Sequence, residues 1–330
     1  MRASPEPAYA DIEAAAKRLA GEAVVTPLLR SRALDETLNA RILIKPETLQ
    51  RTGSFKFRGA FNKISRLAEA TPRPRAIVAF SSGNHAQGVA AAAAALGFPA
   101  TIVMPADAPP IKIANTRGYG AEVVFYDRYK EDREAVAGGI AAERGAALVR
   151  PYDDPDIIAG QGTVGREIAE QAKSRGFAPD IALVPCGGGG LVSGTALALT
   201  QHFPAIRIHA CEPEGFDDTA RSLARHQRIA NEPGAHSICD ALLGASPGEI
   251  TFPINDRLLA GGLVVSDREV TAAMAYGFRV LKLVVEPGGA VGLAALLARK
   301  IDVAGRTVAL VLSGGNIDAE SFAKIAASAR

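Results

Sequence analysis

Short runs rich in β-branched residues alternate along the chain with alanine-rich segments of helical character. Repeated pairs of this kind are typical of βα units, which build parallel sheets covered by helices. We expect strands over residues 41–45, 76–80, 100–104, 122–125, 181–185, 206–211 and 307–312. We expect helices over residues 10–19, 86–96 and 191–202. The pattern therefore predicts an α/β protein with mostly parallel sheets covered by helices.

Proline-rich turns interrupt this pattern at two places. Residues 71–74 read Thr-Pro-Arg-Pro, and residues 150–155 read Arg-Pro-Tyr-Asp-Asp-Pro. Prolines at this density end both strands and helices, which favours domain boundaries. We expect residues 73–150 to form a small domain inserted into a larger one made of residues 1–72 and 151–330. The insertion has about eighty residues, which is the size of a small α/β unit.

Composition excludes several classes of protein. The 330 residues include 37 Lys and Arg against 35 Asp and Glu, with no basic cluster, so we expect no nucleic-acid partner. Three cysteines without a CxxC pair are typical neither of a disulfide framework nor of a zinc ribbon. Charges interrupt the N-terminal segment, and the longest apolar run, 89–96, is shorter than the roughly 20 residues that span a membrane. We therefore expect a soluble, cytoplasmic protein that does not contact membranes.

A run of four glycines lies between an apolar strand and a helical segment. It consists of Gly187, Gly188, Gly189 and Gly190, and Leu191 follows it. A backbone without side chains can approach an anion closely, and the next helix would direct its first N–H groups toward that anion. We therefore expect a phosphate site, although a flexible turn would have the same composition. A P-loop is excluded because no Gly-Lys-Ser/Thr follows.

A dinucleotide site is the alternative use of these glycines. Glu212 ends the next predicted strand, about twenty residues further on, where an acidic residue would bind a ribose. The spacing Gly-x-Gly-x-x-Gly is absent, however, because position 192 is Val. We therefore disfavour NAD as the ligand.

Lys56 lies in the segment Ser-Phe-Lys-Phe-Arg-Gly, residues 54–59. Taken by itself, a lysine is most often a solvated surface charge. Residues 50–60, however, resemble the cofactor-lysine motif of fold-type II pyridoxal 5'-phosphate (PLP) enzymes, specifically the serine/threonine dehydratase and serine racemase family. Three further stretches resemble that family in the same order: residues 81–88 (Ser-Ser-Gly-Asn-His-Ala-Gln-Gly), the four glycines, and residues 313–316 (Ser-Gly-Gly-Asn). The resemblance implies a two-domain fold like that of the tryptophan synthase β subunit.

The resemblance also implies a role for each segment. Lys56 would bind PLP as a Schiff base and would act as the base at the substrate Cα. Asn84 would hydrogen-bond the 3'-oxygen of the cofactor, and Ser313 would face its pyridine nitrogen. The 5'-phosphate would be held by Gly187, Gly188, Gly189, Gly190 and Leu191. The substrate carboxylate would be bound by Ser81, Ser82, Gly83, Asn84 and His85.

Ser313 bears on the type of reaction. A neutral hydroxyl does not force protonation of the ring nitrogen as an aspartate would, so the ring is a weaker electron sink. A short-lived carbanion favours the loss of a β-leaving group over transamination. We therefore expect β-elimination, and the resemblance implies that L-serine or L-threonine is the substrate, converted to a 2-oxo acid and ammonia. Considered alone, Ser-Gly-Gly-Asn also fits a plain turn.

Residues 212–218 resemble the divalent-cation site of the same family. The implied ligands are the carboxylates of Glu212 and Asp218 and the carbonyl of Phe216. Oxygen ligands of this kind suit magnesium or calcium. An acidic surface turn would have a similar composition.

Two residues leave the substrate open. Ser82 stands where catabolic threonine dehydratases usually carry alanine, so the resemblance extends to serine racemase and threo-3-hydroxyaspartate dehydratase. In a racemase, Ser82 would be a second acid–base group on the face opposite Lys56. Arg133 could approach a second substrate carboxylate, although an arginine on a helix surface is the simpler interpretation. A catalytically silent amino-acid sensor is the non-enzymatic alternative, and a homodimer is the expected assembly.

Overall fold

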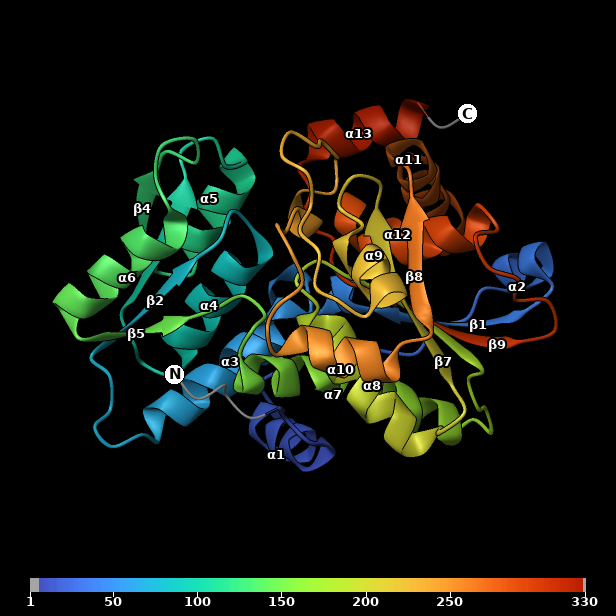
Figure 1. The fold of residues 1–330 in the computed structure, drawn as a ribbon, viewed down its shortest axis with the longest axis horizontal. Coiled ribbons are helices and arrows are strands. Elements are labelled where there is room, and N and C mark those ends of the chain that lie inside the picture. The colour runs from blue at the N-terminus through green and yellow to red at the C-terminus, as the bar shows by residue number, and fades with distance from the viewer. Residues whose placement is uncertain (1–5, 329–330) are drawn as a thin grey trace.

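The computed structural model describes residues 6–328 and contains two sheets of parallel strands (Figure 1). Strands of the larger sheet follow the order β1-β9-β6-β7-β8, and those of the smaller sheet follow the order β4-β3-β2-β5. Neighbouring strands are parallel throughout both sheets. The predicted α/β fold with parallel sheets is therefore confirmed.

The elements have the following bounds. The strands are β1 (Arg41–Pro46), β2 (Ala76–Phe80), β3 (Ala100–Pro105), β4 (Glu122–Tyr126), β5 (Ala146–Val149), β6 (Ile181–Pro185), β7 (Arg207–Pro213), β8 (Gly261–Val265) and β9 (Thr307–Leu312). The α-helices are α1 (Tyr9–Leu19), α2 (Arg32–Leu38), α3 (Lys56–Ala68), α4 (Asn84–Ala95), α5 (Pro110–Gly118), α6 (Arg133–Arg144), α7 (Pro155–Lys173), α8 (Gly190–His202), α9 (Asp218–Arg225), α10 (Thr251–Leu258), α11 (Asp267–Tyr276), α12 (Pro287–Leu297) and α13 (Ala319–Ser328). The shorter turns are η1 (Glu47–Leu49), η2 (Arg51–Gly53), η3 (Asp240–Leu242) and the π-helical η4 (Gly277–Leu281).

All seven predicted strands are present, and two strands were not predicted. β5 has four residues, two of them alanines, so its sequence resembles the end of the preceding helix α6. β8 begins with Gly261 and Gly262, which have low intrinsic preference for strands. Pairing with β2 and with β7, respectively, stabilises these two strands, which is a tertiary effect.

Alternate residues of the larger sheet face two helical layers. On β1, Ile42 and Ile44 pack with residues of α11 and α12, whereas Leu43 packs with residues of α7 and α8. Both faces of the sheet are therefore buried, which explains why its strands are continuous apolar runs.

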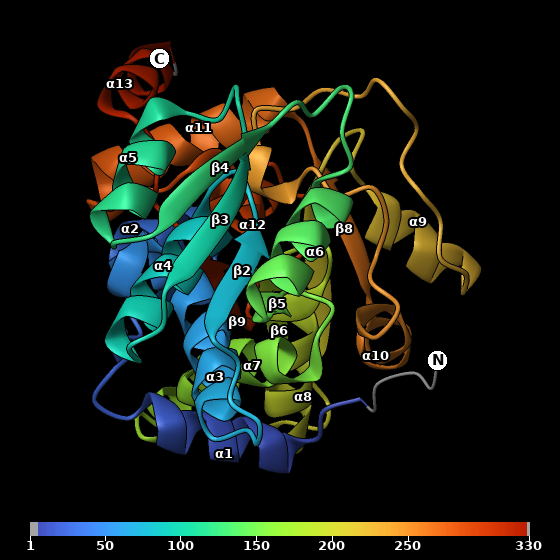
Figure 2. The same cartoon turned by 90° about the vertical axis from the view of Figure 1, so that its left-hand side faces the viewer.

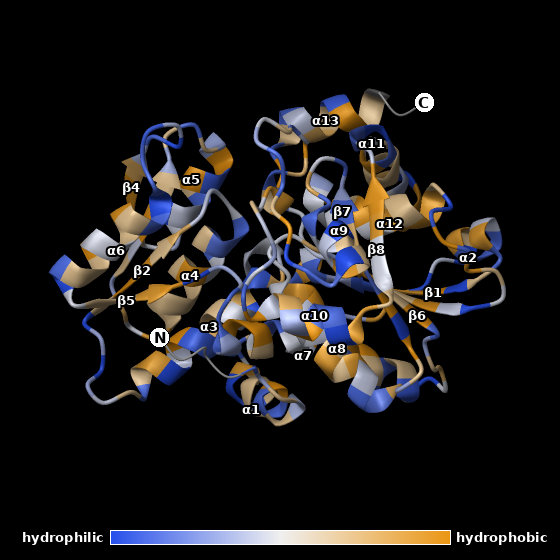
Figure 3. Cartoon of the chain, in the orientation of Figure 1, coloured by the Kyte–Doolittle hydropathy of each residue, from blue (hydrophilic) through white to orange (hydrophobic). Residues whose placement is uncertain are grey.

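The smaller sheet is covered in the same way. Ile77 and Ala79 of β2 pack with α3 and α4, and Val78 and Phe80 pack with α6, which lies toward the viewer in Figure 2. The outer helices mix hydrophobic and hydrophilic residues, as Figure 3 shows for α6 and α13. α3, which lies outside the predicted small domain, packs against α4 of that domain as well as against α7. The proposed division into domains remains a prediction.

Glycines let α7 and α8 pack with their backbones in close contact. A Cβ atom at Gly194 of α8 would overlap the carbonyl oxygen of Ile158, and one at Gly165 of α7 would lie 2.7 Å from the carbonyl oxygen of Thr195. No side chain can be added at either position without separating the helices. The two helices therefore form one tightly packed pair below the larger sheet.

Within residues 6–328, no helix is both long and apolar enough to cross a bilayer.

Four charged side chains are buried together beside the first turn of α3. Arg58 Nε donates to Glu47 Oε2 at 2.7 Å, and Arg58 Nη1 donates to Glu167 Oε1 at 2.6 Å. Lys45 Nζ donates to the second oxygen of Glu167, also at 2.6 Å. Lys45 and Glu47 are fully buried, and Arg58 is 1% exposed. These four residues, which we call the Arg58 cluster, tie α3 to β1 and to α7.

Replacing Arg58 by Leu should destabilise the fold strongly, because Glu47 and Glu167 would stay buried without their main cationic partner. We expect the free energy of unfolding, measured by urea denaturation, to fall by about 3–5 kcal/mol. Arg66→Leu is the matched control, since Arg66 lies on the same helix but is half exposed and pairs with Asp156 at the surface. Its cost should stay within about 1 kcal/mol. Equal losses in the two variants would contradict a structural role for the Arg58 cluster.

Candidate active site

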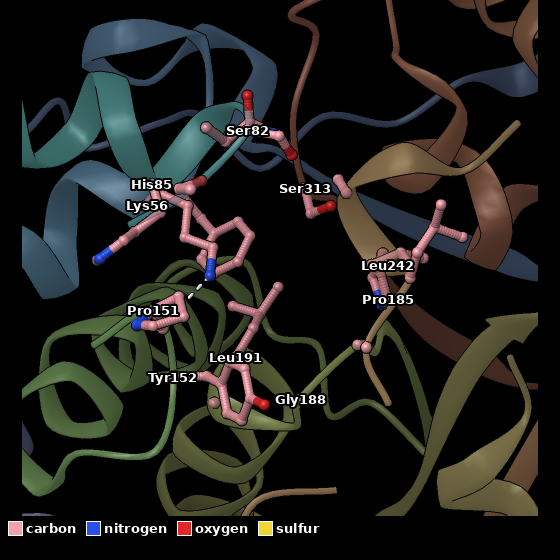
Figure 4. A pocket seen from close by; sticks show the side chains of 18 of the residues that line it. Lys56, Ser82, His85, Pro151, Tyr152, Pro185, Gly188, Leu191, Leu242 and Ser313 are labelled. Atoms are coloured by element: carbon pink, nitrogen blue, oxygen red, sulfur yellow. Dashed lines mark hydrogen bonds between the residues drawn. The ribbon is translucent and has the colours of Figure 1, made fainter. Parts of the chain in front are cut away.

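The carboxyl ends of strands from both sheets meet around one pocket (Figure 4). β6 leads into the glycine run, β9 ends just before Ser313, and β2 ends just before Ser81. In a parallel sheet all carboxyl ends lie at one edge, so the topology brings these loops together. The pocket is thus lined by residues of all four segments that carry the sequence resemblance.

Lys56 is the first residue of α3, and its side chain extends into the pocket. Nζ donates a hydrogen bond to the carbonyl oxygen of Pro151 at 2.7 Å and lies 5.2 Å from the centre of the Phe55 ring. Burial lowers the pKa of the Lys56 ammonium to about 8. Lys56 is therefore more easily deprotonated than a surface lysine.

The glycine run forms the opposite end of the pocket and begins α8. Gly189 has a φ of +96°, which glycine adopts without strain. A Cβ atom at Gly188 would overlap the ring of Tyr152, which lies against the loop. The first N–H groups of a helix have no partner within the helix, so the amides after Gly189 are available to an anion. The glycine run therefore leads into a helix as the sequence predicts, and its use as a phosphate site stays a prediction.

Asn84 links the pocket to two residues on the side of the larger sheet. Its Nδ2 donates to Glu286, and its Oδ1 accepts a hydrogen bond from Asn316 Nδ2 at 2.8 Å. Glu286 is 1% exposed, and burial raises the pKa of its carboxyl to about 7. Asn84 is therefore held in a fixed orientation, and the second hydrogen of its amide could donate to a bound molecule.

The loop between β2 and α4 supplies another wall. Ser81, Ser82, Asn84 and His85 line the pocket. Gly83 lies behind them, where a Cβ atom would be 3.0 Å from the side chain of Lys112. The N–H of Gly83 donates to Ser81 Oγ at 3.1 Å, which closes the turn before α4. Ser313 is drawn to the right of Ser82 in Figure 4, and its carbonyl accepts a hydrogen bond from the Phe55 amide.

Several lining residues were not identified from the sequence. Tyr152 lies in the proline-rich turn that we interpreted only as a boundary, and residues 240–244 lie in a segment without clear periodicity. Gln161 is a buried polar residue in the middle of α7. Its only signal in the sequence is that it interrupts a stretch of small and apolar residues.

Glu212 and Asp218, the carboxylates predicted to bind a cation, are both buried. Glu212 accepts hydrogen bonds from the amides of Thr219 and Ala220 at 3.0 and 2.8 Å. Asp218 Oδ1 accepts from Asn231 at 2.6 Å, whereas Oδ2 has no partner among the described residues. Burial raises the pKa of Glu212 to about 8 and that of Asp218 to about 6. Within residues 6–328 no three side chains of Asp, Glu, His or Cys are grouped as metal ligands, so the site stays a prediction.

The chain is similar to known proteins in both sequence and structure. Residues 20–314 match the model of the family described as pyridoxal-phosphate dependent enzyme. The chain is 46% identical to an L-threo-3-hydroxyaspartate ammonia-lyase of Pseudomonas sp, with 96% of this chain and 98% of that protein covered. It is 40% identical to a serine racemase of Schizosaccharomyces pombe, with 96% of each covered. The crystal structure of a threonine deaminase of T.th. is similar, with 46% identity, a TM-score of 0.88, and coverage of 94% of this chain and 99% of that chain.

Gly188→Ala should destabilise the loop, because the added methyl group would occupy the space of the Tyr152 ring. We expect a loss of about 1–3 kcal/mol, which is typical of overpacking, and a lower melting temperature. The double variant Gly188→Ala, Tyr152→Ala should recover part of this loss. Gly244→Ala is the matched control, since the nearest atom to its Cβ would lie at 3.8 Å. A double variant no more stable than Gly188→Ala would contradict the contact.

Proposed function

The chain belongs to the family of pyridoxal-phosphate dependent enzymes, and we propose that it is an ammonia-lyase that converts L-serine or L-threonine to a 2-oxo acid and ammonia. The observation that carries this proposal is the placement of Lys56, the glycine run and Ser313 around a single pocket. Lysine is the side chain that PLP enzymes bond covalently to the cofactor.

The residues of the pocket fit this cofactor. The glycine run and Leu191 would hold the phosphate at the N-terminus of α8, since a Cβ atom is sterically excluded there at Gly188. Asn84 and Ser313 would contact the ring, and Lys56 would form the covalent bond. When bound, PLP would withdraw electrons from the substrate Cα and so make its proton acidic.

Lys56 Nζ would take the Cα proton. With a pKa of about 8, a fraction of Lys56 is uncharged near neutral pH, which a base requires. The β-hydroxyl would leave with a proton as water. The released enamine would tautomerise and be hydrolysed in solution, so that the net products are a 2-oxo acid and ammonia.

The loop before α4 would bind the substrate carboxylate. Ser81, Ser82, Asn84 and His85 of this loop line the pocket, and the hydroxyls of Ser81 and Ser82 are donors of the kind that a carboxylate accepts from. Ser313 would face the ring nitrogen with a neutral hydroxyl, which leaves the ring a weaker electron sink and so favours elimination over transamination.

L-threo-3-hydroxyaspartate is a second candidate substrate, and Arg133 favours it. Arg133 lines the same pocket, and its guanidinium lies 5.4 Å from the centre of the Phe80 ring. None of the ion pairs formed by described residues includes Arg133. A second substrate carboxylate would supply that partner. The name of the Pseudomonas relative supports this candidate.

Serine racemisation is a further alternative. A second acid–base group must line the same pocket as Lys56. Ser82 does so. The name of the Schizosaccharomyces pombe relative supports it.

We also propose that Glu212, Asp218 and the Phe216 carbonyl bind Mg²⁺ or Ca²⁺. The support is that Asp218 Oδ2 is buried and has no partner among the described residues, while a second buried carboxylate, Glu212, lies near enough for its pKa to be raised by Asp218. Two such carboxylates repel each other unless a proton or a cation neutralises part of their charge.

Lys56→Ala should abolish elimination and should release the cofactor on dialysis, because the covalent bond would be lost. Borohydride reduction of the wild type followed by peptide mapping should place the reduced cofactor on Lys56. A label on any other lysine would remove Lys56 from the proposed reaction.

Arg133→Leu should separate the candidate substrates. If Arg133 binds a second carboxylate, kcat/KM for threo-3-hydroxyaspartate should fall by about 10–100-fold, the cost of a lost charged hydrogen bond, while that for serine stays nearly unchanged. Keto-acid formation measures elimination of each substrate. Chiral analysis of the remaining serine measures racemisation, which a separate variant, Ser82→Ala, should suppress. Equal losses for both substrates would argue against the role of Arg133.

A chelator should lower the melting temperature of the wild type, because a cation that binds only the native state stabilises it. At a cation concentration of about 100 times Kd the stabilisation is about 2.7 kcal/mol. Asp218→Asn should lose most of this response. Identical melting curves of the wild type in chelator, in Mg²⁺ and in Ca²⁺ would reject the cation site.

A further inference from the structure

Two buried side chains in the wall beside Lys56 have polar atoms without hydrogen-bond partners among the described residues. His85 is 2% exposed, and the unpartnered atom is its Nδ1. Gln161 is 1% exposed, and neither its Oε1 nor its Nε2 has a partner there. Leaving a polar atom buried and unpaired destabilises the fold, so such atoms call for a specific use.

Both side chains lie close to the first turn of α3. Gly88 lies one turn after His85 on α4, and a Cβ atom at Gly88 would be 3.0 Å from the carbonyl carbon of Lys56. Gly59 lies one turn after Lys56, and a Cβ atom there would be 2.6 Å from Gln161 Nε2. The helices α4 and α7 therefore approach α3 closely at the turn that carries Lys56.

The ring of His85 is oriented by the backbone. Its Nε2 lies 3.1 Å from the carbonyl oxygen of Val149, which can only accept, so we assign the ring hydrogen to Nε2. Nδ1 is then an acceptor. Burial, together with the charge of Lys56, lowers the pKa of His85 to about 3, so the ring remains neutral. Figure 4 shows His85 and Lys56 on the same side of the pocket.

We propose that His85 Nδ1 and Gln161 Oε1 form an acceptor site for the Lys56 ammonium, and that Nζ turns to this site after it has taken a proton. The inference rests on the proposed role of Lys56 as base. An ammonium has three N–H donors, and within residues 6–328 the Pro151 carbonyl is the one acceptor to which Nζ donates. His85 and Gln161 would supply the other two, which makes them positioning residues for Lys56.

Neutral acceptors suit a base that must release its proton again. A carboxylate would hold the proton on Lys56, whereas neutral acceptors stabilise the ammonium only in part. The other charged or titratable side chains of this pocket are Arg133 from α6, Tyr152 from the turn before α7, and Asp240 from η3. Arg58, on α3 itself, is paired within its own cluster. Burial is the cause of the lowered pKa of Lys56, and none of these four groups contributes to it.

Two variants of Gln161 test the proposal in opposite directions. Gln161→Met removes the acceptor and should lower the pKa of Lys56 by about one pH unit, whereas Gln161→Glu adds a carboxylate and should raise it by at least as much. The pKa is measured on the full-length chain freed of cofactor with hydroxylamine, from the pH dependence of Lys56 acetylation followed by peptide mapping. Circular dichroism establishes that each variant is folded.

Gln87→Met is the matched control. Gln87 lies on α4, and its Nε2 is also buried without a partner among the described residues, but it is not in the wall of the pocket. This variant should leave the pKa of Lys56 unchanged. Shifts of the same sign in both Gln161 variants, or no shift in either, would overturn the acceptor site. Borohydride labelling of another lysine would refute the role of Lys56 as cofactor lysine without altering these acetylation results, so the two failures are distinguishable.

Discussion

The burial of Arg58 is the constraint on which the position of the pocket depends. A guanidinium keeps its charge in a protein, so it can leave water only if carboxylates surround it. One of its partners, Glu47, follows β1, and the other, Glu167, lies on α7. Pairing this single side chain therefore fixes the first turn of α3 against the larger sheet. Lys56 lies two residues before Arg58. The readily deprotonated amine of Lys56 and the permanent charge of Arg58 therefore lie on different sides of one helical turn.

Close helix packing is the second condition. The helices around α3 are rich in glycine and alanine, and these small residues allow backbones to approach within the distance of a single Cβ atom. α4 is buried on nearly every side, so it has no polar face and its hydrophobicity shows little periodicity. A leucine-rich helix could not approach α3 so closely. This close approach brings the polar side chains of α4 and α7 near the turn that carries Lys56.

Much of the architecture could be predicted from the sequence, because buried parallel strands are continuous apolar runs and glycines mark the loops that follow them. The strands β5 and β8 could not, since their pairing partners rather than their own residues stabilise them. In the pocket, Lys56, the glycine run and Ser313 lie in recognisable motifs. Tyr152 and Gln161 of the pocket, and Glu286 behind Asn84, do not, because contacts between residues far apart in the chain bring them there. The Arg58 cluster was missed for the same reason.

The close contact between α7 and α8 determines which part of the pocket can move. The glycine run is continuous with α8, and the backbone of α8 packs directly against that of α7 at Gly165 and Gly194, so that sliding one helix along the other would bring their backbones into collision. The end of the pocket that we propose for the phosphate is therefore fixed to the larger sheet. The loop of residues 81–85, by contrast, is carried by the smaller sheet. Any rotation of one sheet against the other would change the distance between the loop of residues 81–85 and the glycine run, and so between the proposed sites of the substrate carboxylate and of the cofactor phosphate.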